Sequence, residues 1–171
     1  MNKNEVAIVG GAGFVGSRLT ARFNKRGVFS NRYDIDLTNQ MDSIIYLDVE
    51  DIESLEQLTQ ASTIINLAAV HRDDVRPLSR YDDVNVQGAK NVCDAACKHG
   101  IERIIFTSSV AIYGFAPADT DESGESNYFN DYGRTKYLAE QVYKVWQAED
   151  PDNRTLVIVR PTVIFGEGNR G

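Results

Sequence analysis

Short strand-like segments alternate with helical patterns along the whole chain, and this alternation limits the folds that the chain can adopt. The predicted strands lie at residues 6–9, 28–34, 43–47, 63–68, 103–107 and 155–159. Strands that are separated by helices are joined by crossover connections, which place them parallel in one sheet. The sequence therefore predicts an α/β fold, a doubly wound parallel sheet of the Rossmann type, with about six strands and helices on both faces.

Apolar residues at helical spacing predict the helices between these strands. They lie at residues 15–23, 52–58, 84–96 and 131–148. Gly27 and Gly100 follow the first and the third, in the position where glycine commonly ends a helix. The weakest strand is the second, because its centre, Ser-Asn-Arg at residues 30–32, is more polar than a buried strand normally is.

The charge balance excludes several classes of partner. The 171 residues, enough for one domain, include 25 acidic and 18 basic side chains, and the formal net charge is −7. Such a chain repels nucleic acid and anionic lipid, and it has no clustered basic stretch. No apolar run approaches the ~18 residues of a membrane span, and no signal peptide is visible. We expect a soluble, cytoplasmic protein that binds neither nucleic acid nor membrane.

Histidine and cysteine do not form a metal-binding pattern. His71 and His99 have no acidic or sulfur partner at ligand spacing. Cys93 and Cys97 lie four residues apart in a predicted helix, and we expect both to fill a buried apolar face. The sequence predicts no metal site.

A glycine-rich loop separates the first strand from the first helix. Gly10, Gly13 and Gly16 are spaced by three residues, and Phe14 and Val15 lie between the last two. Glycine at these points permits a tight turn, a close approach of backbone to a pyrophosphate, and close packing of helix on strand. The unpaired N–H groups and the positive dipole end of the helix then face the phosphates. This context predicts a dinucleotide site.

Acidic residues follow the next two strands, where a dinucleotide site uses them. Asp34 and Asp36 lie 18 and 20 residues after Gly16, and either one is placed to accept hydrogen bonds from the adenosine ribose. A carboxylate there favours NAD over NADP, although the nearby Arg32 is the type of residue that binds a 2′-phosphate. Asp48 and Val49 come directly after the third strand and suit the edge of the adenine.

Tyr132 and Lys136 begin the last helix, four residues apart and therefore on one face. A free tyrosine has a pKa near ~10, and a neighbouring cation favours the phenolate and lowers that pKa. The phenol is then able to take a proton from a substrate hydroxyl while the carbon gives hydride to a nicotinamide. This spacing predicts a catalytic pair.

Two serines follow the fifth strand at its carboxyl end, where ligands bind in open α/β sheets. Ser109 is predicted to bind the same substrate oxygen as Tyr132 and to stabilise its changing charge. Capping a turn or helix is the role that we expect for Ser108 and not for Ser109.

Five ordered motifs resemble the extended short-chain dehydrogenase/reductase family, in particular its nucleotide-sugar epimerase/dehydratase branch. They are Gly10-x-x-Gly13-x-x-Gly16, Asn66-Leu67-Ala68-Ala69, Thr107-Ser108-Ser109 with Tyr113-Gly114, Tyr132-x-x-x-Lys136, and Arg160-Pro161 with Gly166. The resemblance spans essentially the whole chain. It implies a catalytic set of Ser109, Tyr132 and Lys136, and tightly held NAD that transiently oxidises a sugar hydroxyl of a nucleotide sugar.

The resemblance also implies further contacts with the cofactor. Ala68, Ala69 and His71 correspond to the loop over its ribose and phosphates. Asn85 falls in the motif after that loop, and Pro161 falls where the family covers the nicotinamide. Because no Asp-Glu pair of the dehydratase type follows Ser109, an epimerase or a reductase is favoured over a dehydratase.

Enzymes of this family are about twice as long as this chain, and the second half forms the sugar-nucleotide pocket. We therefore expect residues 1–171 to be the NAD-binding domain of a larger enzyme, without the C-terminal substrate domain. Family members commonly pair through two long helices, here residues 84–96 and 132–148, which implies a homodimer. The competing interpretation is a dinucleotide-binding regulator or sensor that does no chemistry.

Overall fold

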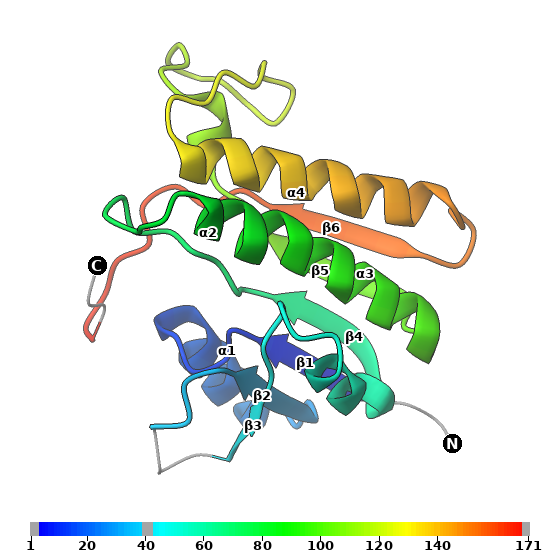
Figure 1. Ribbon diagram of the computed structural model, residues 1–171. Coiled ribbons are helices and arrows are strands. Elements are labelled where there is room, and N and C mark those ends of the chain that lie inside the picture. The colour runs from blue at the N-terminus through cyan, green and yellow to red at the C-terminus, as the bar shows by residue number, and fades with distance from the viewer. Residues whose placement is uncertain (1–3, 39–42, 169–171) are drawn as a thin grey trace.

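The computed structural model describes residues 4–38 and 43–168, and it contains the predicted parallel sheet. The strands are β1 (Glu5–Val9), β2 (Ser30–Asp34), β3 (Ile44–Tyr46), β4 (Ala61–Asn66), β5 (Arg103–Thr107) and β6 (Thr155–Val159). All pairs are parallel, in the order β3-β2-β1-β4-β5-β6 (Figure 1). The strand order reverses between β1 and β4, and doubly wound sheets bind ligands at such a switch point.

Helices cover both faces of the sheet, but unequally. Figure 1 shows α3 (Gly88–His99) and α4 (Asp131–Ala148) side by side on one face, and α1 (Phe14–Lys25) on the other. On β6, Val157 and Val159 are 45% and 43% exposed, while Leu156 packs against the core. The predicted Rossmann fold is confirmed, and the face opposite α4 is open beside β6.

Two helices differ from their predicted form. The predicted helix at residues 52–58 is a 3₁₀ helix, η1 (Ser54–Gln60). The predicted helix at 84–96 starts earlier, as α2 (Ser79–Tyr81) and a π-helical turn, η2 (Asp82–Gln87), that continue into α3. Gly27 and Gly100 have the positive φ angles of helix-ending glycines, 68° and 61°.

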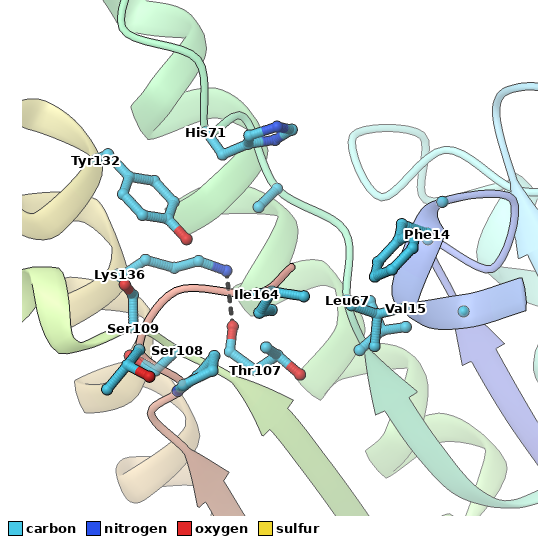
Figure 2. A pocket seen from close by; sticks show the side chains of 16 residues that line it. Phe14, Val15, Leu67, His71, Thr107, Ser108, Ser109, Tyr132, Lys136 and Ile164 are labelled. Atoms are coloured by element: carbon cyan, nitrogen blue, oxygen red, sulfur yellow. Dashed lines mark hydrogen bonds between the residues drawn. The ribbon is translucent and has the colours of Figure 1, made fainter. Parts of the chain in front are cut away.

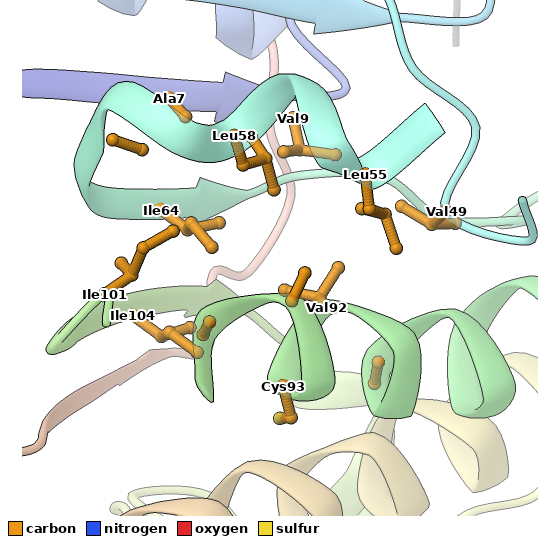
Figure 3. Packing of buried hydrophobic residues seen from close by; sticks show 14 of the residues in the cluster. Ala7, Val9, Val49, Leu55, Leu58, Ile64, Val92, Cys93, Ile101 and Ile104 are labelled. Carbon is orange, nitrogen blue, oxygen red and sulfur yellow. The ribbon is translucent and has the colours of Figure 1, made fainter. Parts of the chain in front are cut away.

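The core lies between the sheet, η1 and α3 (Figure 3). Leu55 and Leu58 of η1 face Val92 of α3 across strand residues such as Val9 and Ile64. Cys93 belongs to this core, as predicted. The same prediction is wrong for Cys97, which is exposed and accepts a hydrogen bond from Arg154 at 3.3 Å.

The polar strand β2 is accommodated because its side chains find buried partners. Asn31 Nδ2 donates to Glu5 Oε2 at 3.0 Å, and the Tyr33 hydroxyl donates to Glu5 Oε1 at 2.5 Å. Arg32 is only 2% exposed, and its Nη1 lies 3.3 Å from Ser17 Oγ of α1. Buried polar groups are tolerated when they are hydrogen-bonded, so pairing replaces apolar contact in this strand.

The glycine turn after β1 brings three elements too close together for side chains. Gly10 has φ +77°, and a Cβ there would lie 2.7 Å from the amide nitrogen of Ala68. A Cβ on Gly16 would lie 2.6 Å from Cα of Gly11, so α1 packs directly on the turn. At Gly13, by contrast, a Cβ would meet only the Gly10 carbonyl oxygen, at 3.4 Å.

These contacts predict different effects for two matched substitutions. Gly16→Ala should lower the free energy of unfolding by ~1–3 kcal/mol, because α1 has to move away from the turn. Gly13→Ala should leave stability nearly unchanged, since φ −67° and ψ 175° suit alanine. Urea unfolding of both variants measures this, and equal losses would contradict the packing described for Gly16.

Candidate active site

An elongated groove crosses the carboxyl ends of the strands at the switch point. It consists of two cavities, of about 390 Å³ and about 290 Å³, that share the lining residues Gly10, Gly13, Leu67, Ala69 and His71. The glycine turn and the segment after β4 therefore form its middle. We refer to the larger cavity as the reaction cavity and to the smaller one as the acidic cavity.

The reaction cavity brings together the residues that were predicted for catalysis. Ser109, Tyr132 and Lys136 line one side, and Phe14 and Val15 of α1 line the other (Figure 2). The remaining lining residues are Gly10, Gly13, Gly16, Leu67, Ala69, His71, Thr107, Ser108, Pro161, Thr162 and Ile164. Residues far apart in sequence thus enclose one space next to a helix N-terminus.

Lys136 reaches the cavity from the buried face of α4. Its Nζ donates to the carbonyl oxygen of Thr107 at 2.8 Å, as the dashed line in Figure 2 shows, and lies 4.8 Å from the Phe106 ring centre. The side chain is 2% exposed. Burial lowers its pKa to about 7, and the negative charge of Glu140, one turn further along α4, opposes this shift.

Tyr132 lies at the mouth of the cavity, with Lys136 Nζ 5.9 Å from its ring centre. Burial raises the pKa of Tyr132, and a hydrogen bond with Ser109 opposes that rise. The direction differs from the lowering that the sequence led us to expect. The reason is that the ammonium of Lys136 is directed at Thr107, so desolvation of the phenol has the larger effect.

The capping role predicted for Ser108 belongs to Ser109. Ser109 is the N-cap of the 3₁₀ helix η3 (Val110–Tyr113), and its Oγ accepts from the amide of Ala111 at 3.1 Å. Ser108 is 1% exposed at the base of the reaction cavity. The expectation that only Ser108 would cap is wrong, because Ser109 is the residue with extended backbone before the turn.

The acidic cavity distinguishes between the two candidate ribose acids. Asp34 lines it, and its Oδ2 accepts from the amide of Ala12 in the glycine turn at 2.9 Å. Asp36 is exposed, does not line either cavity, and accepts from the amide and hydroxyl of Thr38 at 2.9 and 2.6 Å. Asp48, Val49 and Ala68 also line this cavity.

Asn85 does not line the groove, contrary to its predicted contact with a cofactor. It is 4% exposed, and its amide bonds both the N–H and the carbonyl of Val70, at 2.8 and 2.9 Å. Its Nδ2 also donates to Thr135 Oγ1 of α4 at 2.9 Å. Asn85 therefore holds the segment that carries Ala68, Ala69 and His71 through the backbone of Val70, without lining the groove itself.

Several lining residues were not among the predicted site residues. In the acidic cavity they are Val9, Ile35, Leu47, Glu50, Val70, Arg80 and Val84. Arg80 and Glu50 form a two-point ion pair at 2.6 Å there. In the reaction cavity Leu67, Thr107, Thr162 and Ile164 were missed. Leu67 and Thr107 stand inside quoted motifs at strand ends, which was the available signal. Arg80 comes from a helix whose start was not predicted.

The described residues contain neither a metal-binding cluster nor a membrane-spanning helix. Within 4–38 and 43–168, no group of three or more His, Cys, Asp or Glu side chains is arranged to hold a metal ion. No helix in those ranges has the length and apolar character needed to cross a bilayer.

Known proteins of similar sequence and fold include several epimerases. An epimerase from Escherichia coli O157:H7, named N-acetyl-alpha-D-glucosaminyl-diphospho-ditrans,octacis-undecaprenol 4-epimerase, is 46% identical over 177 residues, covering 100% of this chain and 52% of that relative. A Brucella ovis UDP-glucose 4-epimerase crystallised with NAD is 28% identical with a TM-score of 0.83, over 92% of this chain and 51% of that one. The structure of MoeE5 with UDP-glucose and NAD is 27% identical with a TM-score of 0.86, over 97% and 56%.

The chain thus spans about half the length of the curated relative and of the solved structures. Residues 6–171 match the sequence profile described as the NAD dependent epimerase/dehydratase family. On this match and the 46% identity, the chain belongs to the NAD dependent epimerase/dehydratase family.

Proposed function

We propose that this chain is the NAD-binding and proton-transferring part of a sugar 4-epimerase, and that its substrate is a hexose carried on a diphosphate. The observation that carries this proposal is the meeting of Ser109, Tyr132 and Lys136 in one cavity that continues past the glycine turn to Asp34. A module that only senses a dinucleotide does not require the first three groups. We therefore favour catalysis over the sensor interpretation.

The residues of the groove fit NAD. Gly10 and Gly13 leave backbone open to a pyrophosphate at the start of α1, whose N–H groups and dipole favour anions. The Asp34 carboxylate suits ribose hydroxyls and repels a 2′-phosphate. Arg32, the type of residue that binds the 2′-phosphate of NADP, is buried against Ser17 and does not line the groove. When bound, NAD supplies a reversible acceptor for the hydrogen on the sugar carbon.

Proton transfer is assigned to Tyr132. Its phenolate removes the proton of the sugar hydroxyl as the carbon is oxidised, and the resulting phenol returns that proton when the keto sugar is reduced from its other face. Ser109, which lines the same cavity as Tyr132, stabilises the charge that develops on the oxygen. Lys136 lines the same cavity and contributes positive charge to it when its amine is protonated.

Substitution of Tyr132 by phenylalanine tests this assignment. Tyr132→Phe should lower kcat by ~10²–10⁴-fold, the usual contribution of a general acid–base group. NAD affinity of the chain should be nearly unchanged. Tyr137→Phe, on the same helix but packed against Tyr128, is the matched control. Turnover is measured in the full-length protein with UDP-linked and polyprenyl-diphosphate-linked N-acetylhexosamine, and equal activity of the two variants would refute the proposal.

Replacement of each of the two aspartates by asparagine tests the ribose contact. Asp34→Asn should weaken NAD binding by ~10-fold or more and reduce discrimination against NADP, because a hydrogen bond to a charged group contributes ~1.5–3 kcal/mol. Asp36→Asn should change neither, since that carboxylate faces Thr38. Calorimetric titration with both dinucleotides decides this. A larger effect at Asp36 would reverse the assignment.

The burial of Lys136 should lower the free energy of unfolding of the native chain at neutral pH. Its folded-state pKa of about 7 lies below the unfolded value of 10.5, so the unfolded chain binds more protons between these values. Stability of the native chain should therefore rise with pH through this window. Lys136→Met should be more stable at neutral pH, with an advantage that shrinks toward pH 10.5. Urea unfolding across this range tests the sign, and a growing advantage would contradict it.

Three further points stay predictions. Residues 1–171 supply the cofactor-binding domain of a longer enzyme, in line with the half-length match to its relatives. A homodimer through α3 and α4 fits the 60% exposure of Val145 on α4. A cytoplasmic location fits the acidic composition.

A further inference from the structure

The face of α4 that carries Tyr132 and Lys136 continues inward with a third ionisable side chain. Glu140 lies one turn after Lys136, and its side chain is 0% exposed. Arg160, directly after β6, donates from Nε to Oε1 at 2.8 Å and from Nη2 to Oε2 at 2.7 Å. Burial alone would raise the pKa of Glu140, but hydrogen bonds, foremost from Arg160, hold it below its usual value. A two-point pair of this kind fixes direction as well as charge.

The remaining nitrogen of the Arg160 guanidinium, Nη1, reaches the turn that carries Ser109. Its Nη1 donates to the Tyr113 hydroxyl at 2.5 Å and to the Glu122 carbonyl at 2.9 Å. Tyr113 is the last residue of η3, and Ser109 is the N-cap of the same short helix. One guanidinium therefore joins α4 to both the end of η3 and the loop that follows it.

Backbone hydrogen bonds complete this connection on either side of Ser109. The amide of Ser108 donates to the Val159 carbonyl at 2.8 Å, and the amide of Val110 donates to the Pro161 carbonyl at 3.2 Å. The chain on both sides of Arg160 thus holds the chain on both sides of Ser109. The backbone position of Ser109 is therefore tied to that of Arg160.

We propose that Arg160 is a positioning residue that, through Glu140 and Tyr113, sets the approach of Ser109 to Tyr132. Arg160, Glu140 and Tyr113 do not line the groove, so Arg160 acts on it only through Ser109, which does. Its effect on turnover rests on the function proposed above. Its effect on the position of Ser109 beside Tyr132 does not, and that effect is measurable without turnover.

Arg160→Lys is the informative variant, because it keeps the positive charge beside Glu140 but loses the two-point hydrogen bond to Glu140 and the hydrogen bond to Tyr113. The readout is the carbon-13 chemical shift of Tyr132 Cζ, at neutral pH and through an alkaline titration, assigned with Tyr132→Phe. We expect Arg160→Lys to move both the shift and the pKa of Tyr132 toward those of Ser109→Ala. In the Ser109→Ala background, Arg160→Lys should then have no further effect.

Arg154→Lys is the matched control. Arg154 also joins the β6 side to α4, through the Trp146 carbonyl at 2.5 Å and Glu149 at 3.0 Å, but at the far end of the helix. It should leave Tyr132 unchanged. Tyr113→Phe removes one hydroxyl and keeps the ion pair, so it should fold and shift Tyr132 in the same direction as Arg160→Lys, by less.

Three results would overturn the proposal. The first is that the Tyr132 signal is unchanged both in Tyr113→Phe and in a folded Arg160→Lys variant. The second is that Arg160→Lys shifts Tyr132 as much in the Ser109→Ala background as it does when Ser109 is present. The third is that Arg154→Lys shifts Tyr132 as much as Arg160→Lys does. In the full-length protein, Arg160→Lys should lower kcat by up to ~100-fold, as for a small misplacement of reacting groups, with KM and NAD affinity nearly unchanged. Absence of NAD-dependent turnover in the native protein would instead refute the proposed function and leave the chemical-shift result standing.

Discussion

The contact between the Lys136 ammonium and the carbonyl at the end of β5 is the interaction on which the site depends. A buried charge is unfavourable unless it is paired and hydrogen-bonded, and Lys136 has the Thr107 carbonyl, the Phe106 ring and, one turn away, Glu140. These partners belong to the sheet and to α4, so satisfying the lysine fixes the start of α4 at the edge of the groove. Tyr132 is held over the reaction cavity as a consequence.

The opposite side of the groove is built from backbone. The amides of Gly10 and Gly11 both donate to the Tyr33 carbonyl at the end of β2, and the Ala12 amide donates to Asp34. This arrangement explains how a chain with a net charge of −7 can offer a site to a diphosphate. N–H groups and a helix dipole supply the positive potential, and side-chain cations are not required.

Prediction from sequence succeeded where a pattern had a local physical cause. The last helix was predicted at the residues that α4 occupies, because its apolar spacing is a local pattern. Prediction failed where a distant partner decides the outcome. Asn85 was predicted to contact the cofactor, but it lies in the π-helical turn and bonds Val70 and Thr135 instead. The polar β2, by contrast, was correctly predicted as a strand, and its side chains pair with Glu5 and Ser17.

The sequence by itself determined the order of strands and helices, the glycine turn and the spacing of Tyr132 and Lys136, since each depends on residues within one or two turns of one another. Only the tertiary structure decided which aspartate faces the glycine turn and in which direction the Tyr132 pKa moves. Those outcomes depend on burial and on hydrogen bonds between segments that are 20 or more residues apart, and no local pattern encodes them.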